Sequence, residues 1–260
     1  MDLQLKAQQA FRNKDFETAE QLLLQCVEQK PNDAIILMRL GQVYMAQAKF
    51  QESFDSLRKA QQQDPQNPDV YRSLGMAIRM SGLIDLGISY LGTMLTYAPL
   101  ILQPQVHLTL AELFAVKGDD ISLMNSLLLL EKLPPVDNPR MVLRLWGEIH
   151  NIEGMKRFTS QYSSLSDLAY GLIHEQSNSS LAIEFLQKGT CSDFWEADLC
   201  LYRLTGESIY LSNAHMKAPK TAEVLVEVAK EQNNMDVLQK ISVSPVVFSS
   251  VRRRAQQILN

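Results

Sequence analysis

The sequence predicts an all-α fold, an array of antiparallel helix hairpins, and three observations support it. Pro31, Pro65 and Pro99 follow one another at intervals of 34 residues. The residues between these prolines keep the same phase, with small and large apolar residues at fixed positions. No run of alternating apolar and polar residues is long enough for a sheet. A fixed period of this length indicates helical repeats, in which each hairpin buries its apolar face on the next.

Four sets of equivalent positions carry the period. They are Leu3, Leu37 and Tyr71; Ala7, Gly41 and Gly75; Ala19, Ser53 and Gly87; and Leu23, Leu57 and Leu91. We expect the second set where the first helix of a hairpin crosses the second, because a small side chain lets two helix axes approach closely. We expect the large residues to fill the space between neighbouring hairpins.

These positions resemble those of the tetratricopeptide repeat, a helix-turn-helix with a recurring proline after its second helix. The second repeat matches best, with Leu37, Leu40, Gly41, Tyr44, a turn at Ala48-Lys49, Phe50, Ser53, Leu57, Ala60 and Pro65. A fourth repeat follows with a slip, since Pro135 lies 36 residues beyond Pro99 and Leu123 takes the usual small position. The resemblance implies a right-handed superhelical array, a tetratricopeptide-like α-solenoid.

The resemblance divides the chain into two regions. Residues 1–135 are predicted to form four tetratricopeptide repeats, at about 1–33, 34–67, 68–101 and 104–137. Residues 138–260 are predicted to be degenerate helical repeats that continue or cap the array, and a separate small helical domain is the alternative. Helices are expected there at Met141–Ile152, Leu165–Glu175, Ser180–Lys188, Phe194–Leu204, Lys220–Gln232, Met235–Ile241 and Pro245–Leu259, with Gly154 among the breaks between them.

Composition narrows the function classes. The chain has 260 residues, 46% of them hydrophobic, and 25 Lys and Arg against 29 Asp and Glu give a formal net charge of −4. Without an excess of cations to neutralise phosphates, nucleic acid is not expected as a partner. The most apolar stretch, Leu83 to Leu102, contains Asp85 and Pro99, so membrane insertion is not expected either.

The amino terminus and the cysteines favour a cytoplasmic protein. The chain starts directly in an amphipathic pattern, without the apolar core of a secretory signal. Cys26, Cys191 and Cys200 are an odd number without metal-type spacing, as expected for free thiols in a reducing compartment.

In tetratricopeptide arrays the first helices of successive repeats line a concave groove, and the resemblance implies which residues face it here. The partner-binding residues predicted on this basis are Gln8, Phe11, Arg12, Met38, Arg39, Gln42, Met45, Arg72, Met76, Arg79 and Met80. Methionine adapts to apolar side chains of varied shape, and arginine pairs with carboxylates. The groove is therefore predicted to hold an amphipathic, partly acidic polypeptide.

The alternative is that the four methionines pack within the array or against the C-terminal helices, and that the arginines are solvated. One tetratricopeptide family grips a terminal carboxylate with Lys and Asn at set groove positions. Those positions hold Gln4, Gln8, Arg39, Asp69 and Ser73 here, so this clamp is not expected. Arg252-Arg253-Arg254 is the densest positive cluster and is expected at a solvated helix end, because three successive residues point in different directions.

No catalytic, cofactor or metal site is predicted. The chain has no phosphate-binding glycine loop, no nucleophile elbow, and no histidine at a metal-ligand spacing. If an enzyme were hidden in the second half, Trp195, Cys200 and His215 are where we expect it. The predicted function is a non-catalytic protein-interaction module, similar to tetratricopeptide chaperones and assembly factors of secretion or pilus systems. A ligand- or peptide-responsive regulator is the alternative, and self-association into a homo-oligomer stays open.

Overall fold

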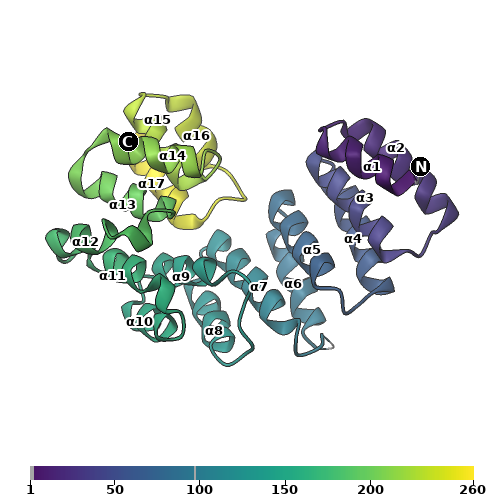
Figure 1. Ribbon diagram of the computed structural model, residues 1–260, viewed down its shortest axis with the longest axis horizontal. Helices are drawn as coiled ribbons and strands as arrows, with labels where there is room; N and C mark the ends of the chain where they lie inside the picture. The colour runs from purple at the N-terminus through teal and green to yellow at the C-terminus, as the bar shows by residue number, and fades with distance from the viewer. Residues whose placement is uncertain (1–2, 97) are drawn as a thin grey trace. The chain divides into compact units, whose positions relative to one another are not determined.

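The computed structural model describes residues 3–96 and 98–260 as an all-helical protein (Figure 1). This part of the chain contains seventeen α-helices, two short 3-10 helices and no strand. Residues 1–2 of the first predicted repeat and residue 97 of the third lie outside it. The all-α prediction is therefore confirmed, and successive antiparallel hairpins are consistent with an α-solenoid. None of the described helices is long and apolar enough to cross a lipid bilayer.

The chain divides into two compact units. Unit 1 comprises Met1–Leu113 and Lys132–Val136, and unit 2 comprises Phe114–Glu131 and Asp137–Asn260. The helices of unit 1 are α1 Leu3–Arg12, α2 Phe16–Gln29, α3 Ala34–Ala46, α4 Phe50–Gln63, α5 Pro68–Ser81, α6 Ile84–Met94 and most of α7 Gln103–Lys117. Unit 2 contains the end of α7, then α8 Asp120–Leu130, α9 Pro139–Glu148, α10 Ile152–Gln161, α11 Ser166–His174, α12 Ser179–Leu186, α13 Trp195–Thr205, α14 Ser208–Lys217, α15 Ala222–Glu231, α16 Met235–Ser242 and α17 Ser249–Leu259.

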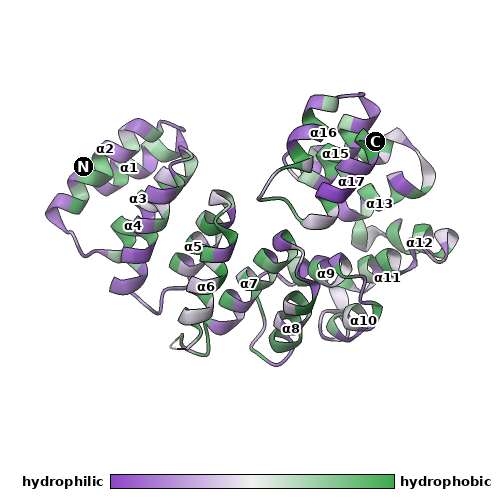
Figure 2. Ribbon diagram, turned by 180° about the vertical axis from the view of Figure 1, so that it is seen from behind, coloured by the Kyte–Doolittle hydropathy of each residue, from purple (hydrophilic) through white to green (hydrophobic). Residues whose placement is uncertain are grey.

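Many helices begin at an Asp or Asn whose side chain accepts a hydrogen bond from a backbone N–H of the first turn. This cap satisfies a donor that has no partner within the helix. Helices α2, α3, α5, α8, α9, α10, α12 and α16 begin in this way, at Asp15, Asp33, Asn67, Asp119, Asn138, Asn151, Asn178 and Asn234. Hydrophilic and hydrophobic residues lie side by side along most helices (Figure 2), as in amphipathic helices that pack by one face.

The turn inside each hairpin of unit 1 repeats one backbone conformation. Lys14, Ala48 and Gly82 have φ of 62°, 60° and 71°, all in the left-handed region. They lie between the first and second helices of successive hairpins, 34 residues apart. Glycine adopts this conformation at little cost, whereas Lys14 and Ala48 do so with a side chain. The 34-residue period therefore extends to the backbone of the turns.

Small residues sit at helix crossings, as predicted, although not always at the predicted crossing. A Cβ added to Gly41 would lie 2.6 Å from Leu57 Cγ, and the buried Ser53 hydroxyl donates to the Gly41 carbonyl at 2.7 Å. Both neighbours belong to α4, the second helix of the same hairpin. Gly75 differs, because the atoms nearest to its added Cβ belong to Thr109 of α7, in the next hairpin. The small residue at this position therefore also sets the spacing between neighbouring hairpins.

Unit 2 departs from the expected helices in two places. The missed helices are α10 and α14, and Gly154, expected as a break, lies inside α10. A Cβ there would lie 2.4 Å from Trp146 Cε3, and the indole of Trp146 is fully buried. Gly154 therefore lets α10 pack flat against the Trp146 ring of α9. The predicted break at Gly154 is therefore wrong, because this glycine allows close helix packing and does not end a helix.

The carboxy-terminal helix, α17, is hydrogen-bonded to the first helices of unit 2. The Arg252 guanidinium donates to the carbonyl oxygens of Ser244, Val247 and Val116, at 3.2, 3.0 and 2.8 Å. The backbone N–H of Ser250 donates to Glu148 Oε1 at 3.3 Å. Arg252 is therefore an internal brace, and the expectation of a solvated arginine cluster is wrong for it.

Candidate functional site

The predicted groove residues of α1 lie at the surface of unit 1. Phe11 is 36% exposed and Arg12 is exposed, whereas Gln8 is half-buried. The Phe11 ring packs against Phe16 at the start of α2, with 5.5 Å between ring centroids. Phe11 thus packs against the second helix of the first hairpin while part of its side chain stays exposed.

The predicted residues of α3 are less accessible. Met38 is half-buried against the core cluster of Leu37, Ala60 and Val70. Arg39 and Met45 are also half-buried. Gln42 Nε2 donates to the Ser73 hydroxyl at 3.0 Å, which ties α3 to α5.

The predicted residues of α5 form one exposed stripe. Arg72, Met76 and Met80 follow one another at four-residue intervals, so they share a helix face. Met76 and Met80 are 45% and 44% exposed, and Arg72 is paired with Asp69 of the same helix at 3.0 Å.

Arg79 on the neighbouring row of α5 forms an ion pair with Glu112 of α7. The bonds from Gln42 and Arg79 therefore place α3, α5 and α7 side by side in unit 1. Leu108 and Thr109 of α7 are buried.

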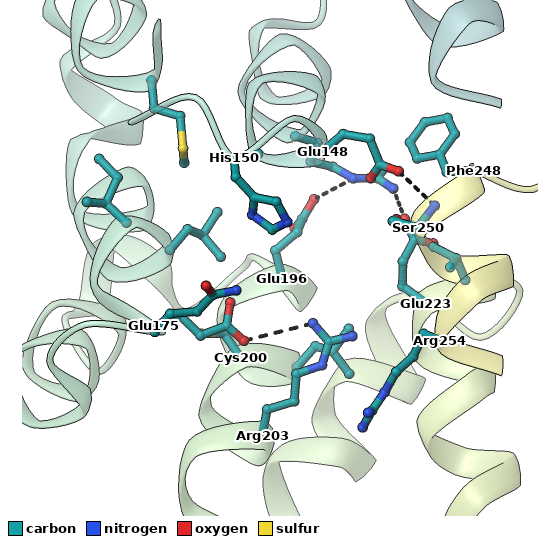
Figure 3. Close-up of a pocket in the computed structure, with 18 of the residues that line it drawn as sticks. Glu148, His150, Glu175, Glu196, Cys200, Arg203, Glu223, Phe248, Ser250 and Arg254 are labelled. Atoms are coloured by element: carbon teal, nitrogen blue, oxygen red, sulfur yellow. Dashed lines mark hydrogen bonds and ion pairs between the residues drawn. The ribbon is translucent and has the colours of Figure 1, made fainter. Parts of the chain in front are cut away.

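Unit 2 contains a pocket of about 890 Å³ that the sequence did not predict. It is lined by residues of α9, α10, α11, α13, α15 and α17, together with the turn after α9 and the segment after α11 (Figure 3). Trp195, Leu199, Val226, Phe248 and Val251 give it an apolar wall. Pockets of this size accommodate a small organic ligand or a few residues of a peptide.

Arg144 organises one end of this pocket. Its guanidinium forms an ion pair with Glu223 and lies 3.9 Å from Glu196 Oε1. The same guanidinium lies 4.9 Å from the centroid of the Trp195 ring and 5.6 Å from that of Phe248. Two carboxylates and two aromatic rings therefore satisfy this cation from within the protein.

Two buried carboxyl groups at this end, Glu196 and Glu148, have a raised pKa. Burial raises the pKa of Glu196, and the Arg140 and Arg144 guanidiniums oppose that rise. Burial also raises the pKa of Glu148, against the hydrogen bond donated by the Ser250 N–H. Both carboxyls therefore hold protons to a higher pH than exposed glutamates do.

A second arginine group lies across the pocket. Glu227 of α15 is fully buried, and its Oε1 accepts a hydrogen bond from Arg254 Nε at 3.2 Å and forms an ion pair with Arg203 Nε at 3.4 Å. The two arginines come from α13 and α17, and their side chains are 36% and 43% exposed. One buried carboxylate thus holds two guanidiniums by their inner nitrogens.

The structure brings together only two of the three residues named above as candidates for an enzymatic site. Trp195 and Cys200 both line the pocket, whereas His215 is not among its lining residues. Burial raises the pKa of the Cys200 thiol, so it stays protonated and is a poor nucleophile. Among the described residues, no three His, Cys, Asp or Glu side chains are placed to share a metal ion.

The sequence did not predict the charged pocket residues, because they come from four helices and the segment after α11, with no common spacing. One signal was present in the sequence. Glu227 stands within Val224-Leu225-Val226-Glu227-Val228-Ala229, where a lone carboxylate interrupts an apolar run. A buried charge needs a partner, so this pattern predicts a cation from another element, although it does not say which one.

Comparisons with known proteins agree with the hairpin architecture. A family model described as "Tetratricopeptide repeat" matches residues 10–77. The crystal structure of a tetratricopeptide repeat protein from Parabacteroides merdae ATCC 43184 aligns with 99% of this chain and 98% of its own, at a TM-score of 0.53 and 14% identity. A chain of the Naa15/Naa10 complex bound to HypK-THB aligns with 99% of this chain at a TM-score of 0.40 and 16% identity, but this chain spans only 41% of its length. No curated protein matches the sequence.

Proposed function

We propose that this chain, which is a tetratricopeptide repeat protein, is a non-catalytic scaffold that binds a partner polypeptide on the first helices of unit 1. The observation that carries the proposal is the exposed stripe on α5. Met76 and Met80 leave 45% and 44% of their surface in solvent, although unit 1 has a well-packed core beneath them. Exposed, adaptable apolar side chains at helical spacing suit an amphipathic partner segment.

The charges beside the stripe suggest a partly acidic partner. Arg12 and Arg72 are exposed, and Arg39 is half-buried on the helix between them. Arg72 already has Asp69 as an exposed partner, an arrangement that contributes little to stability and can be exchanged for a carboxylate of the ligand. By contrast, Gln42 and Arg79 brace neighbouring helices, so we assign them a positioning role.

In the mechanism we propose, unit 1 shields an apolar segment of its partner before that partner assembles, as a cytoplasmic chaperone or assembly factor would. A role in a secretion or pilus system is the version of this proposal that the resemblance suggests. Shielding needs only a preformed face, and the hydrogen bonds between α3, α5 and α7 keep that face in place.

The test is the pair Met76→Glu and Met80→Glu in the full chain. Both residues are exposed, so the fold should be retained, while two new carboxylates oppose an acidic, apolar partner. The partner is first identified by native pull-down and mass spectrometry, and its Kd is then measured by calorimetry. We expect Kd to rise at least about tenfold, or about 1.4 kcal/mol.

A matched control makes the same chemical change elsewhere. Met216 and Met235 of unit 2 are 73% and 46% exposed, so Met216→Glu with Met235→Glu adds the same charge without touching the stripe. An equal loss of affinity in both double variants would mean that net charge, and not the α5 stripe, governs binding.

The pocket of unit 2 favours a second candidate, a regulator whose contacts change when a small ligand or peptide binds. A cavity of about 890 Å³ with an apolar wall and several charged groups is suited to such a ligand. Small-angle X-ray scattering separates the two functions, because regulation requires the dimensions of the protein to change on ligand binding and shielding does not.

A further inference from the structure

We infer that the unit 2 pocket binds an oxyanion, a carboxylate or a phosphate carried on an apolar chain, through the paired guanidiniums of Arg203 and Arg254. This names the ligand chemistry of the pocket and stands whether or not a partner binds unit 1. The inference begins with the geometry of three side chains from α13, α15 and α17.

Glu227 fixes both arginines without using their outer nitrogens. Its Oε1 accepts a hydrogen bond from Arg254 Nε at 3.2 Å and forms an ion pair with Arg203 Nε at 3.4 Å. Because Nε lies on the inner edge of the guanidinium, the terminal Nη groups are left for other acceptors. Glu227 is fully buried, so the anchor cannot be reached by solvent and acts as a positioning residue.

The outer nitrogens have no hydrogen-bond acceptor within the described residues of the protein. For Arg254, no Nη contact accompanies its bond to Glu227. For Arg203, Nη1 lies 3.9 Å from Glu175 Oε1, which is beyond hydrogen-bond distance. Each positioned guanidinium therefore keeps N–H donors in the fork arrangement that carboxylates and phosphates accept.

The apolar part of the ligand follows from what surrounds the pair. Leu199 precedes Arg203 by one turn of α13, Val226 adjoins Glu227, and Val251 precedes Arg254 on α17; all three line the pocket. An alkyl or aliphatic peptide chain attached to the oxyanion would lie on these side chains. The cavity volume of about 890 Å³ leaves room for such a chain.

The carboxylates of the pocket do not compete for this position. Figure 3 shows Glu148 and Glu196 across the pocket from Arg203 and Arg254. Glu196 and Glu223 are taken up by arginines of α9, and Glu148 accepts the Ser250 N–H. Glu175 Oε1 forms an ion pair with Arg203 Nη1 at 3.9 Å without a hydrogen bond (Figure 3), so the N–H donors of Arg203 remain for a ligand.

The experiment uses the full chain and defined probes in isothermal titration calorimetry. Hexanoate and hexyl phosphate carry the oxyanion, hexanol carries none, and hexylammonium carries the opposite charge. Acetyl-leucyl-leucine and its amide then test whether a polypeptide terminus, as opposed to a free small molecule, supplies the group. We expect saturable binding of the oxyanion probes and at least about tenfold weaker binding of hexanol and hexylammonium.

The variants separate the site from general electrostatics. Arg254→Gln removes one guanidinium of the pair, and we expect at least about a tenfold loss of affinity for hexyl phosphate. Arg253→Gln removes the same charge from the preceding residue of α17, which is exposed and outside the pocket, and should change the affinity less than about twofold.

Circular dichroism reports whether each variant folds. If Arg254→Gln unfolds, the double variant Arg203→Lys with Arg254→Lys keeps both charges on Glu227 but lacks the guanidinium fork, and the same loss of affinity is expected with the fold intact. Failure of every oxyanion probe to bind, preference for hexylammonium, or equal losses in Arg253→Gln and Arg254→Gln would overturn the inference.

Discussion

Two glycines of α6 provide a direct test of how closely the helices of unit 1 approach one another. Gly87 is buried, and a Cβ added there would lie 2.0 Å from Ile78 Cγ2 of α5 and 3.2 Å from Leu113 Cδ1 of α7. Gly92 lies on the exposed side of the same helix, where an added Cβ meets no atom within 4 Å. The same substitution, glycine to alanine, therefore adds one methyl group in two opposite environments.

The expected energies follow from this contrast. Alanine favours a helix over glycine by about 0.5–1 kcal/mol at either position, so Gly92→Ala should be stabilising. At Gly87 the same gain is outweighed by overpacking, which costs about 1–3 kcal/mol. Ile78 is β-branched and held in one rotamer in a helix, so its methyl group cannot swing away and α6 must shift. Because the propensity terms cancel, the two variants should differ by the steric cost alone, about 1–3 kcal/mol.

Urea unfolding followed by circular dichroism measures this difference, and thermal unfolding gives a second reading. For a chain of this length, 1 kcal/mol corresponds to roughly 2–4 °C in Tm. Repeat arrays need not unfold in one step, so native-state hydrogen exchange at α5 and α6 should show where stability is lost. If Gly87→Ala is as stable as Gly92→Ala, the close contact between α5 and α6 is wrong.

Three further predictions concern stability. Ala48→Gly should stabilise unit 1 by about 1 kcal/mol, because it removes a side chain from a left-handed turn; a lower urea midpoint would contradict this. Leu57→Ala should cost about 2–5 kcal/mol, and Gly41→Ala should cost less in that background than alone, a coupling that a double-mutant cycle measures. Burial raises the pKa of Glu148 in the folded protein. The contribution of Glu148 to stability is therefore fully present below its ordinary pKa of 4.5 and is lost as the pH rises through the higher pKa of the folded state. Glu148→Gln should therefore raise Tm at neutral pH but not in acid, and a pH-independent gain would rule out this origin.

The first half of the chain could be predicted closely because its determinants are local and periodic. The turn position of Ala48 and the crossing position of Gly41 recur every 34 residues, so the structure of one repeat predicts that of the next. Thr109 shows the limit of that approach. Its contact with Gly75 joins neighbouring hairpins, and the identity of the residue across such a crossing depends on how two helices are inclined.

In the second half of the chain the 34-residue period fades, and the role of a single residue can no longer be inferred from its equivalents in other repeats. Gly154 has the composition signature of a helix break, yet its neighbour is an indole ring that needs a flat surface. Arg252 has the signature of a solvated charge, yet three carbonyl oxygens accept from it. In both positions the partners lie outside the residue's own helix, Trp146 on α9 and the three carbonyls on α7 and on the segment before α17, so local propensity gave the wrong answer.

The sequence by itself determined the all-helical class, the hairpin repeat and the positions of most helices, because hydrophobic period, caps and turns are properties of neighbouring residues. Only the tertiary structure decided that Met76 and Met80 are exposed while Met38 packs inward, and that Glu227 holds Arg203 and Arg254 at a pocket. Those features require side chains from three or more helices to meet. Such meetings depend on the angles and distances between packed helices, which no single stretch of sequence encodes.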